Sequence, residues 1–351
     1  MFLAIWMAAT LASGQTFGDW LGDQPRNEPD YDTILSYRTS AAAFWEIGRA
    51  MDAHPDVARV EAIGESTRGV PIWAFHVGPE PQDADHSVLV FANLHALEWI
   101  GTDVAVDLLL ELLESPPQDV AVTVIPISNP DGRAKVENDL RLDRTVYRRG
   151  NAVGVDLNRD WAINRDPPAV WKKIIPAYYG HSAEPLSQPE TQAIDALVAR
   201  NGYTRAASLH SFGGYLYYPW SGAWERHPDH DDFVTLGRAM EAAQGRRAYR
   251  TRQLSHWGFF FRACGSEIDH LYGTYGTRAF LVEMTRSGIR PFRLRKDLKT
   301  HFRWYNPRRS AKHRERGVIA MRTLIEHPTL DGESDGVQPP ELPFGQTLES
   351  P

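Results

Sequence analysis

The chain has 351 residues, of which 42% are hydrophobic and 24% are charged, so it can bury a large core in one big α/β domain or two small ones. Its formal net charge of −7 argues against general nucleic-acid binding. The single cysteine, Cys264, excludes an internal disulfide but leaves the cellular compartment open.

The first 14 residues form a short apolar segment with small residues near its end. Such a segment is typical of the hydrophobic region of a signal peptide, although no Lys or Arg precedes it. We therefore expect a signal peptide over residues 1–14 and a secreted or periplasmic protein, with a buried N-terminal segment as the alternative. This stretch is too short to span a bilayer and no other is apolar enough, so we expect no integral membrane association.

The next segments predict a helix followed by a hairpin. Residues 40–54 carry apolar side chains at helical spacing, and either Thr39 or Ser40 can cap the helix. Two strand-like runs, 58–63 and 70–77, are separated by a turn that contains two glycines. With the strands that follow, this pattern predicts a mixed sheet with helices on both faces.

His95 and Glu98 lie between a predicted strand and a predicted helix. Residues 87–92 form an apolar run typical of a buried strand, and residues 104–113 have helical periodicity. The pair therefore follows the carboxyl end of a strand, where open α/β sheets bind ligands. An imidazole and a carboxylate three residues apart can bind one ion, and zinc accepts both ligand types. Alone the pair is a weak signal, because the chain contains 13 histidines.

Further motifs follow this pair in the sequence. After another predicted strand comes Ser128-Asn-Pro-Asp-Gly-Arg133, whose composition predicts a turn. A basic stretch then leads into Gly154-Val-Asp-Leu-Asn-Arg159. His210 ends a strand-like run in the sequence Leu-His-Ser, and Glu283 is the one charge inside the apolar run 279–284.

The C-terminal part contains a basic stretch and a polar tail. From Arg286 to Arg316 there are 12 Lys and Arg against two acids, a local charge of +10. This stretch is either a solvated surface that pairs with the acidic remainder or a surface for an anionic partner. Residues 327–351 are rich in Pro, Gly and acids and predict a flexible tail. We therefore expect a single catalytic domain over residues 15–326.

In their order and spacing, five motifs of this chain resemble those of the zinc metallocarboxypeptidases. They are the His-x-x-Glu pair, Asn-Pro-Asp-Gly, Gly-Val-Asp-Leu-Asn-Arg, Leu-His-Ser and the glutamate of the last strand. This is the family of the pancreatic carboxypeptidases A and B and their bacterial relatives, and the resemblance covers residues 31–324. It implies an α/β/α sandwich around a mixed, mainly parallel eight-stranded sheet, without the large propeptide of the pancreatic forms. It also implies a monomeric zinc-dependent enzyme that hydrolyses the C-terminal peptide bond of peptides.

The same resemblance assigns the metal ligands and the general base. It implies one Zn²⁺ per chain, bound by His95, Glu98 and His210, with water as the fourth ligand. Glu283 matches the general base, and a lone carboxylate on a buried strand is expected to have a raised pKa. The alternative for Glu283 is a structural ion pair with a neighbouring arginine.

Arginine and asparagine side chains are implied to bind the substrate. Asn158 and Arg159 match the pair that grips the C-terminal carboxylate of the substrate, which makes the enzyme an exopeptidase. The alternative is that Arg159 pairs with a neighbouring aspartate. The arginine that stabilises the oxyanion matches Arg149 by the compact bacterial spacing, whereas the pancreatic spacing selects Arg141 or Arg144.

Three positions depart from the family pattern or set its specificity. Leu97 stands where the family often has an arginine. Phe261 falls at the position of the mobile tyrosine that caps the pocket, and it lacks the hydroxyl, so we expect weaker substrate binding. Ile268 falls at the pocket floor, where an aliphatic side chain favours apolar or aromatic C-terminal residues. A shift of one residue would place Glu267 or Asp269 there and favour Lys or Arg.

Two other functions stay open at this point. Relatives with the compact pattern include amidases or carboxypeptidases of bacterial cell-wall peptides, whose substrates also end in a free carboxylate. A non-catalytic binding relative is the third possibility, and the complete ligand set together with Glu283 argues against it.

Overall fold

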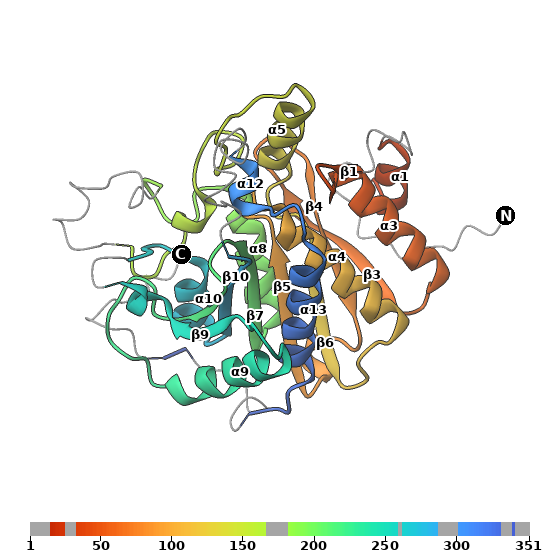
Figure 1. Cartoon of the computed structure of the whole chain (residues 1–351). Coiled ribbons are helices and arrows are strands. Elements are labelled where there is room, and N and C mark those ends of the chain that lie inside the picture. Colours follow the sequence, from red (N-terminus) through yellow and green to blue (C-terminus); the bar gives the residue numbers. More distant parts are fainter. Residues whose placement is uncertain are drawn as a thin grey trace.

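The computed structural model describes residues 15–24, 33–165, 182–258, 262–286, 301–330 and 339–340, and all structural statements refer to these residues. An eight-stranded sheet forms the centre, with helices on both faces (Figure 1). Its strand order is β3-β4-β6-β5-β7-β10-β8-β9. Four of the seven adjacent strand pairs are parallel and three are antiparallel, which confirms the predicted mixed, mainly parallel eight-stranded sheet.

The strands of this sheet are β3 (Ala58–Glu65), β4 (Pro71–Val77), β5 (His86–Ala92), β6 (Val120–Ile125), β7 (Arg205–Ser211), β8 (Tyr215–Tyr218), β9 (Arg250–Gln253) and β10 (Arg278–Met284). A separate two-stranded ribbon pairs β1 (Thr33–Ile34) with β2 (Tyr37–Arg38). The α-helices are α1 (Phe17–Gly22), α3 (Ser40–Ala53), α4 (Trp99–Glu114), α5 (Pro130–Arg141), α8 (Pro189–Asn201), α9 (His230–Ala243), α10 (Glu267–Tyr275), α12 (Phe302–Tyr305) and α13 (Ala311–Glu326). Three short 3₁₀ helices are η1 (Pro81–Asp83), η2 (Leu157–Arg159) and η3 (Leu254–Trp257).

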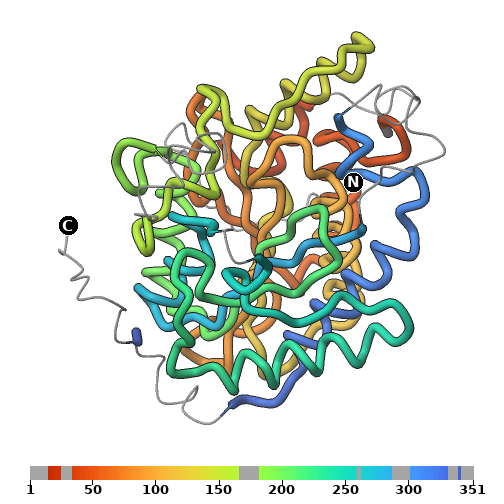
Figure 2. Tube along the Cα trace, turned by 60° about the vertical axis from the view of Figure 1, so that its left-hand side comes forward, coloured from red at the N-terminus to blue at the C-terminus, as the bar shows by residue number. Residues whose placement is uncertain are grey.

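Two apolar cores lie on opposite faces of the sheet. Alternate residues of each strand point to opposite faces, so Val88 and Val90 belong to one core and Leu89 and Phe91 to the other. The first core is covered by α3, α4, α9 and α13, and the second by α8 and α10. Helix α13 lies in front of the sheet in Figure 1 and at the right-hand edge in Figure 2, as expected for an outer layer.

Three parallel strands bring distant residues to one edge of the sheet. β5, β7 and β10 are neighbours in the order β5-β7-β10, so their carboxyl ends lie side by side. His210, near the end of β7, is directly paired in register with Glu283 of β10. The loop after β5 carries His95 and Glu98 to the same edge. The topology therefore gathers residues that are up to 188 positions apart in the sequence.

One predicted element is wrong. The segment Ser128–Arg133 does not form a turn between elements, because α5 begins at Pro130. Asn129 caps this helix, since its Oδ1 accepts a hydrogen bond from the backbone of Gly132 at 2.9 Å. Proline at the first helical position and asparagine at the cap are common at helix starts as well as in turns, so composition alone misled the prediction.

Several predictions fall on residues outside the described part of the chain. These are the signal segment 1–14, Phe261, and residues 331–338 and 341–351 of the tail. Among the helices that the structure describes, none is both long and apolar enough to cross a bilayer.

Candidate metal centre and active site

The loop between β5 and α4 is built to present His95 and Glu98. Asn93 adopts a left-handed conformation with φ of 62°, which asparagine tolerates better than most residues, and its side chain donates to the carbonyl of His95 at 2.9 Å. Asn129 donates to the carbonyl of Leu94, also at 2.9 Å. Helix α4 begins directly after Glu98. The two asparagines therefore fix the loop from both sides.

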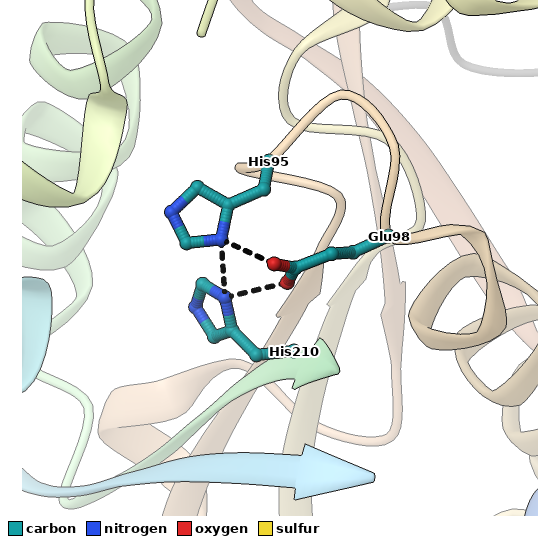
Figure 3. Close-up of side chains that lie close together, drawn as sticks. All are labelled: His95, Glu98 and His210. Atoms are coloured by element: carbon teal, nitrogen blue, oxygen red, sulfur yellow. Dashed lines mark hydrogen bonds and ion pairs between the residues drawn. The ribbon is translucent and has the colours of Figure 1, made fainter. Parts of the chain in front are cut away.

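Three side chains meet at the edge of the sheet. The Nδ1 atom of His95 lies 2.9 Å from Oε1 of Glu98, and Nδ1 of His210 lies 3.0 Å from Oε2 (Figure 3). The two Nδ1 atoms are 2.9 Å apart. All three residues are at most 2% exposed. The structure thus brings together the three predicted metal ligands in a buried cluster whose donor atoms all lie within 4.8 Å of one another.

Both imidazoles have a carboxylate on their far side. Nε2 of His95 lies 3.1 Å from Asp156, and Nε2 of His210 lies 2.9 Å from Glu267. An imidazole whose Nε2–H donates to a carboxylate carries its lone pair on Nδ1. Two such lone pairs and one carboxylate then point at the same space, which suits a cation. Two imidazoles and one carboxylate suit zinc, so the residues present fit the metal.

The pKa values of the cluster residues also fit a site for a cation. Burial alone would raise the pKa of Glu98, but His95 and His210 outweigh it and hold this pKa well below its ordinary value. Burial would lower the pKa of His210, but Glu267 and Glu98 outweigh it and raise this pKa to about 10. Without a metal the cluster therefore retains a proton, and a divalent cation would displace it.

Glu283 lies beside the cluster, and no ion pair joins it to another residue of the described part of the chain. Its Oε2 atom is buried and has no hydrogen-bond partner among the described residues. Burial, and next the nearby carboxylate of Glu98, raises its pKa, as expected from the sequence. The alternative of a structural ion pair finds no support at Arg278, which bonds to Asp232 at 2.8 Å instead. Glu283 is thus a carboxylate that can hold and release a proton near neutral pH.

Arg149 and Asp156 contact the ligand cluster and also line the cavity beside it. Nε of Arg149 donates to Asp156 at 2.7 Å, and its Nη1 lies 3.4 Å from Glu98. Arg149 lines the cavity in front of the cluster, whereas Arg141 and Arg144 do not. The geometry therefore favours Arg149 among the three candidates for the oxyanion arginine.

Asn158 and Arg159 come from η2, directly after Asp156. Asn158 uses its Oδ1 to accept a hydrogen bond from the backbone of Glu267 at 3.2 Å. Arg159 is 6% exposed, and its Nη1 donates to the carbonyl of Asn158. Both residues line the cavity, and amide and guanidinium groups are donors that suit a carboxylate.

A single cavity of about 450 Å³ contains these groups. One part of its wall is aliphatic and the other part is aromatic. The aliphatic residues are Leu254, Ala263 and Leu281, and the aromatic ones are Tyr147, Phe212, Trp304 and Tyr305. Tyr147 and Tyr305 place their hydroxyl groups 3.2 Å apart. The cavity is large enough for the side chain and carboxylate of one terminal residue.

Two sequence-predicted positions lie away from the cavity surface. Ile268 is fully buried in the second core and is not among the residues that line the cavity, so its expected place at the pocket floor stays a prediction. The cause is packing, because three residues of the same core, Leu254, Ala263 and Leu281, form the wall instead. Leu97 is 2% exposed and belongs to the first core. Leu97 therefore packs in the apolar core at the position where an arginine of the relatives is expected to contact the substrate.

Sequence reasoning missed several residues of the site. Asp156 stands inside the Gly-Val-Asp-Leu-Asn-Arg motif, so its spacing from Arg159 could have suggested a role. Glu267 was considered only for specificity, and no local signal tied it to His210. Trp304 and Tyr305 reach the cavity from α12, about 20 residues after Glu283, where no motif marks them.

Comparisons with known proteins were made against family profiles and characterised sequences. A family profile described as zinc carboxypeptidase matches residues 46–301. Carboxypeptidase A4 of Mus musculus is 23% identical over 273 residues, which is 74% of this chain and 65% of that protein. Carboxypeptidase B2 of Homo sapiens is 24% identical over 261 residues, which is 69% of this chain and 61% of that protein. The chain therefore spans less than two thirds of the length of these relatives.

Solved structures with the same fold include the thrombin activatable fibrinolysis inhibitor, with a TM-score of 0.65 and 19% identity. That match covers 87% of this chain and 77% of the other. Carboxypeptidase A from Helicoverpa armigera gives a TM-score of 0.63 at 16% identity and covers 87% and 78% of the two chains. At these identities the likeness concerns the fold, and it agrees with the predicted sandwich.

Proposed function

The chain belongs to the zinc carboxypeptidase family, and from this premise we propose that it hydrolyses the C-terminal peptide bond of peptides. One observation carries the proposal. His95 and Glu98, which form the ligand cluster with His210, and the carboxylate of Glu283 line one cavity together with the donors of Asn158 and Arg159. The first four groups serve hydrolysis, and the last two serve recognition of a terminal carboxylate.

Zinc bound by the three ligands would act as a Lewis acid that polarises a carbonyl and lowers the pKa of water. Asp156 and Glu267 hold the two imidazoles in the tautomer that ligation needs. Glu283 takes a proton from the attacking water and delivers it to the leaving amine. Arg149 supplies fixed positive charge where the carbonyl oxygen becomes negative.

Asn158 and Arg159 would bind the terminal carboxylate of the substrate. A guanidinium offers two parallel donors to a carboxylate, and the Nδ2 of Asn158 would add another. An internal peptide bond has no carboxylate at this place, so the proposal restricts cleavage to chain ends.

The cavity wall supports a preference for an apolar C-terminal residue. Leu254, Ala263 and Leu281 form its aliphatic part, and none of them offers a counter-charge for Lys or Arg. The proposed preference is still for an apolar C-terminal residue, as predicted from Ile268, but we assign it to these three wall residues.

A pair of matched peptides tests the proposed function. A peptide ending in Phe with a free carboxylate should release Phe, and the same peptide with a C-terminal amide should not. Arg159→Ala should raise KM for the free acid at least tenfold while the zinc content stays unchanged. Equal cleavage of acid and amide, or loss of zinc from the variant, would contradict the assigned roles. Faster cleavage of a cell-wall tripeptide than of the Phe peptide would favour the amidase alternative.

We also propose that residues 15–326 form one catalytic domain and that residues 1–14 direct export. The continuous sheet supports the first part, since its strands run from residue 58 to residue 284. Expression with and without residues 1–14, followed by fractionation, tests the second. Retention of both forms inside the cell would contradict export.

A further inference from the structure

A second cavity, of about 700 Å³, lies outside the proposed active site. We call it the cationic cavity, because five permanently charged side chains line it. They are Arg247, Arg286, Arg309, Lys312 and Arg316. The described residues that line this cavity include no acidic residue. They share no residue with the lining of the proposed active site.

The five cations come from three separate parts of the fold. Arg247 follows α9, Arg286 follows β10, and the other three lie at or just before the start of α13. Helices α9 and α13 pack side by side (Figure 1). Tyr249 connects two of these parts, since its hydroxyl donates to the carbonyl of His313 at 3.3 Å. The tertiary fold, and not a local run of basic residues, therefore brings these charges together.

These charges are not neutralised by the described residues. No ion pair joins any of the five cations to an acid there, whereas Arg314 on the same helix pairs with Asp107. Lys312 and Arg316 are four residues apart, a spacing at which like charges on a helix repel. Burial, and next the charges of Arg316 and Arg286, lowers the pKa of His313. The positive field therefore reaches the interior of the cavity.

The start of α13 adds to this field. Ser310 provides no side-chain cap, and no acidic residue lies in the first turn. The N-terminal end of a helix carries partial positive charge, so Lys312 is unfavourable there unless an anion is close. An oxyanion in the cavity would relieve this repulsion and accept hydrogen bonds from the guanidinium groups.

We propose that the cationic cavity binds a polyvalent oxyanion, a molecule with two or more phosphate or sulfate groups. Five cations exceed what a single phosphate can neutralise, and the volume leaves room for a larger molecule. Arginine forks bind phosphate and sulfate oxygens in pairs, which favours these groups over a lone chloride. This binding is separate from peptide hydrolysis and does not depend on the proposed function.

Isothermal titration calorimetry of the full chain tests the proposal with two probes, one that carries sulfate groups and one that carries phosphate groups. Sucrose octasulfate carries sulfate esters, and fructose 1,6-bisphosphate carries phosphate esters. At low ionic strength at least one probe should bind at one site per chain, and raising the salt should weaken it. Binding of fructose 1,6-bisphosphate would show that the site accepts phosphate esters, and binding of sucrose octasulfate would show that it accepts sulfate esters. Absence of binding by both probes would overturn the proposal.

Neighbouring arginines provide a matched control. Arg309 lines the cavity, whereas Arg308 is equally exposed in the sequence-adjacent position and does not line it. Arg309→Glu should weaken probe binding at least tenfold, and Arg308→Glu should change it less than threefold. Lys312→Gln serves as a second, milder variant and should also weaken binding. Equal losses for Arg308→Glu and Arg309→Glu would show unspecific attraction and overturn the site.

Discussion

Each of the two histidine ligands has a carboxylate at its far nitrogen. When Asp156 and Glu267 accept from the far nitrogens of His95 and His210, both near nitrogens direct their lone pairs at one space. Glu283 differs from these carboxylates because, among the described residues, it forms no hydrogen bond with either imidazole, and its buried Oε2 has no partner. A carboxylate thus orients a ligand in two places and stays available for proton transfer in the third.

Glu283→Gln tests the division between metal binding and proton transfer. The amide keeps the size of the side chain but cannot accept a proton, so kcat should fall at least a hundredfold. Zinc content should stay at one per chain, because Glu283 is not a ligand in this account. Elemental analysis and peptide turnover on the same sample check both points, and a residual rate within tenfold of the parent would contradict the base assignment.

At the scale of single elements, the ends of strands and the starts of helices position the side chains of the site. The parallel order β5-β7-β10 sets His210 beside Glu283, and the capped start of α5 supports the loop that carries His95. Asn129 serves both elements, because its Oδ1 caps α5 and its Nδ2 holds the carbonyl of Leu94.

Asn129→Ala should therefore affect stability and metal binding together. Loss of the cap costs about 1 kcal/mol, and loss of the contact to Leu94 should loosen the ligand loop and weaken zinc binding several-fold. Thr39→Ala is the matched control, because Thr39 caps α3 through the backbone of Ala42, away from the ligand loop. Thermal unfolding and zinc competition distinguish them, and equal zinc affinity in both variants would contradict the proposed support of the loop.

The sequence could predict those parts of the site that local pattern encodes. His95 and Glu98 follow a clear strand, and Glu283 is a single charge in an apolar run. The parallel edge that joins them follows from the fold class implied by the resemblance. Tyr305 could not be predicted, because it reaches the cavity through tertiary packing of α12 alone. The burial of Ile268 could not be predicted for a related reason, since spacing gives its position in α10 but not which neighbours cover it.

The start of α5 shows a different limit. Asn-Pro-Asp-Gly has the composition of a turn, and the same residues begin a helix when the following segment can continue it. Deciding between the two requires the packing of residues 130–141, whose mean character is polar. The fold class was accessible from the sequence, whereas this boundary was not.

At the scale of the whole molecule, buried titratable groups set how stability depends on pH. His227 is 3% exposed, its Nε2 has no partner among the described residues, and aromatic rings of Trp220, Phe233 and Tyr272 surround it. Burial, and next His230 and Arg278, lowers its pKa to about 3. The folded protein therefore holds this imidazole neutral at pH values where the unfolded chain would bind a proton.

The sign of the effect follows from proton binding. Between pH 6.5 and about 3 the unfolded state binds more protons at this residue, so stability falls as the pH falls. The contribution of one such group is at most ~1.4 kcal/mol per pH unit. His227→Phe should flatten the dependence of the unfolding free energy on pH in this window. Denaturant titrations of zinc-free protein at several pH values check this, and parallel curves for parent and variant would contradict the assignment.

The most direct measurement is the zinc content of the purified protein, determined by elemental analysis beside His210→Ala and Lys312→Gln. The account predicts one zinc per chain in the parent and in Lys312→Gln, whose substitution lies in the cationic cavity. It predicts at most a tenth of that amount in His210→Ala after dialysis. A parent without zinc, or His210→Ala with its zinc retained, would contradict the claim that side chains from distant strands form one metal centre.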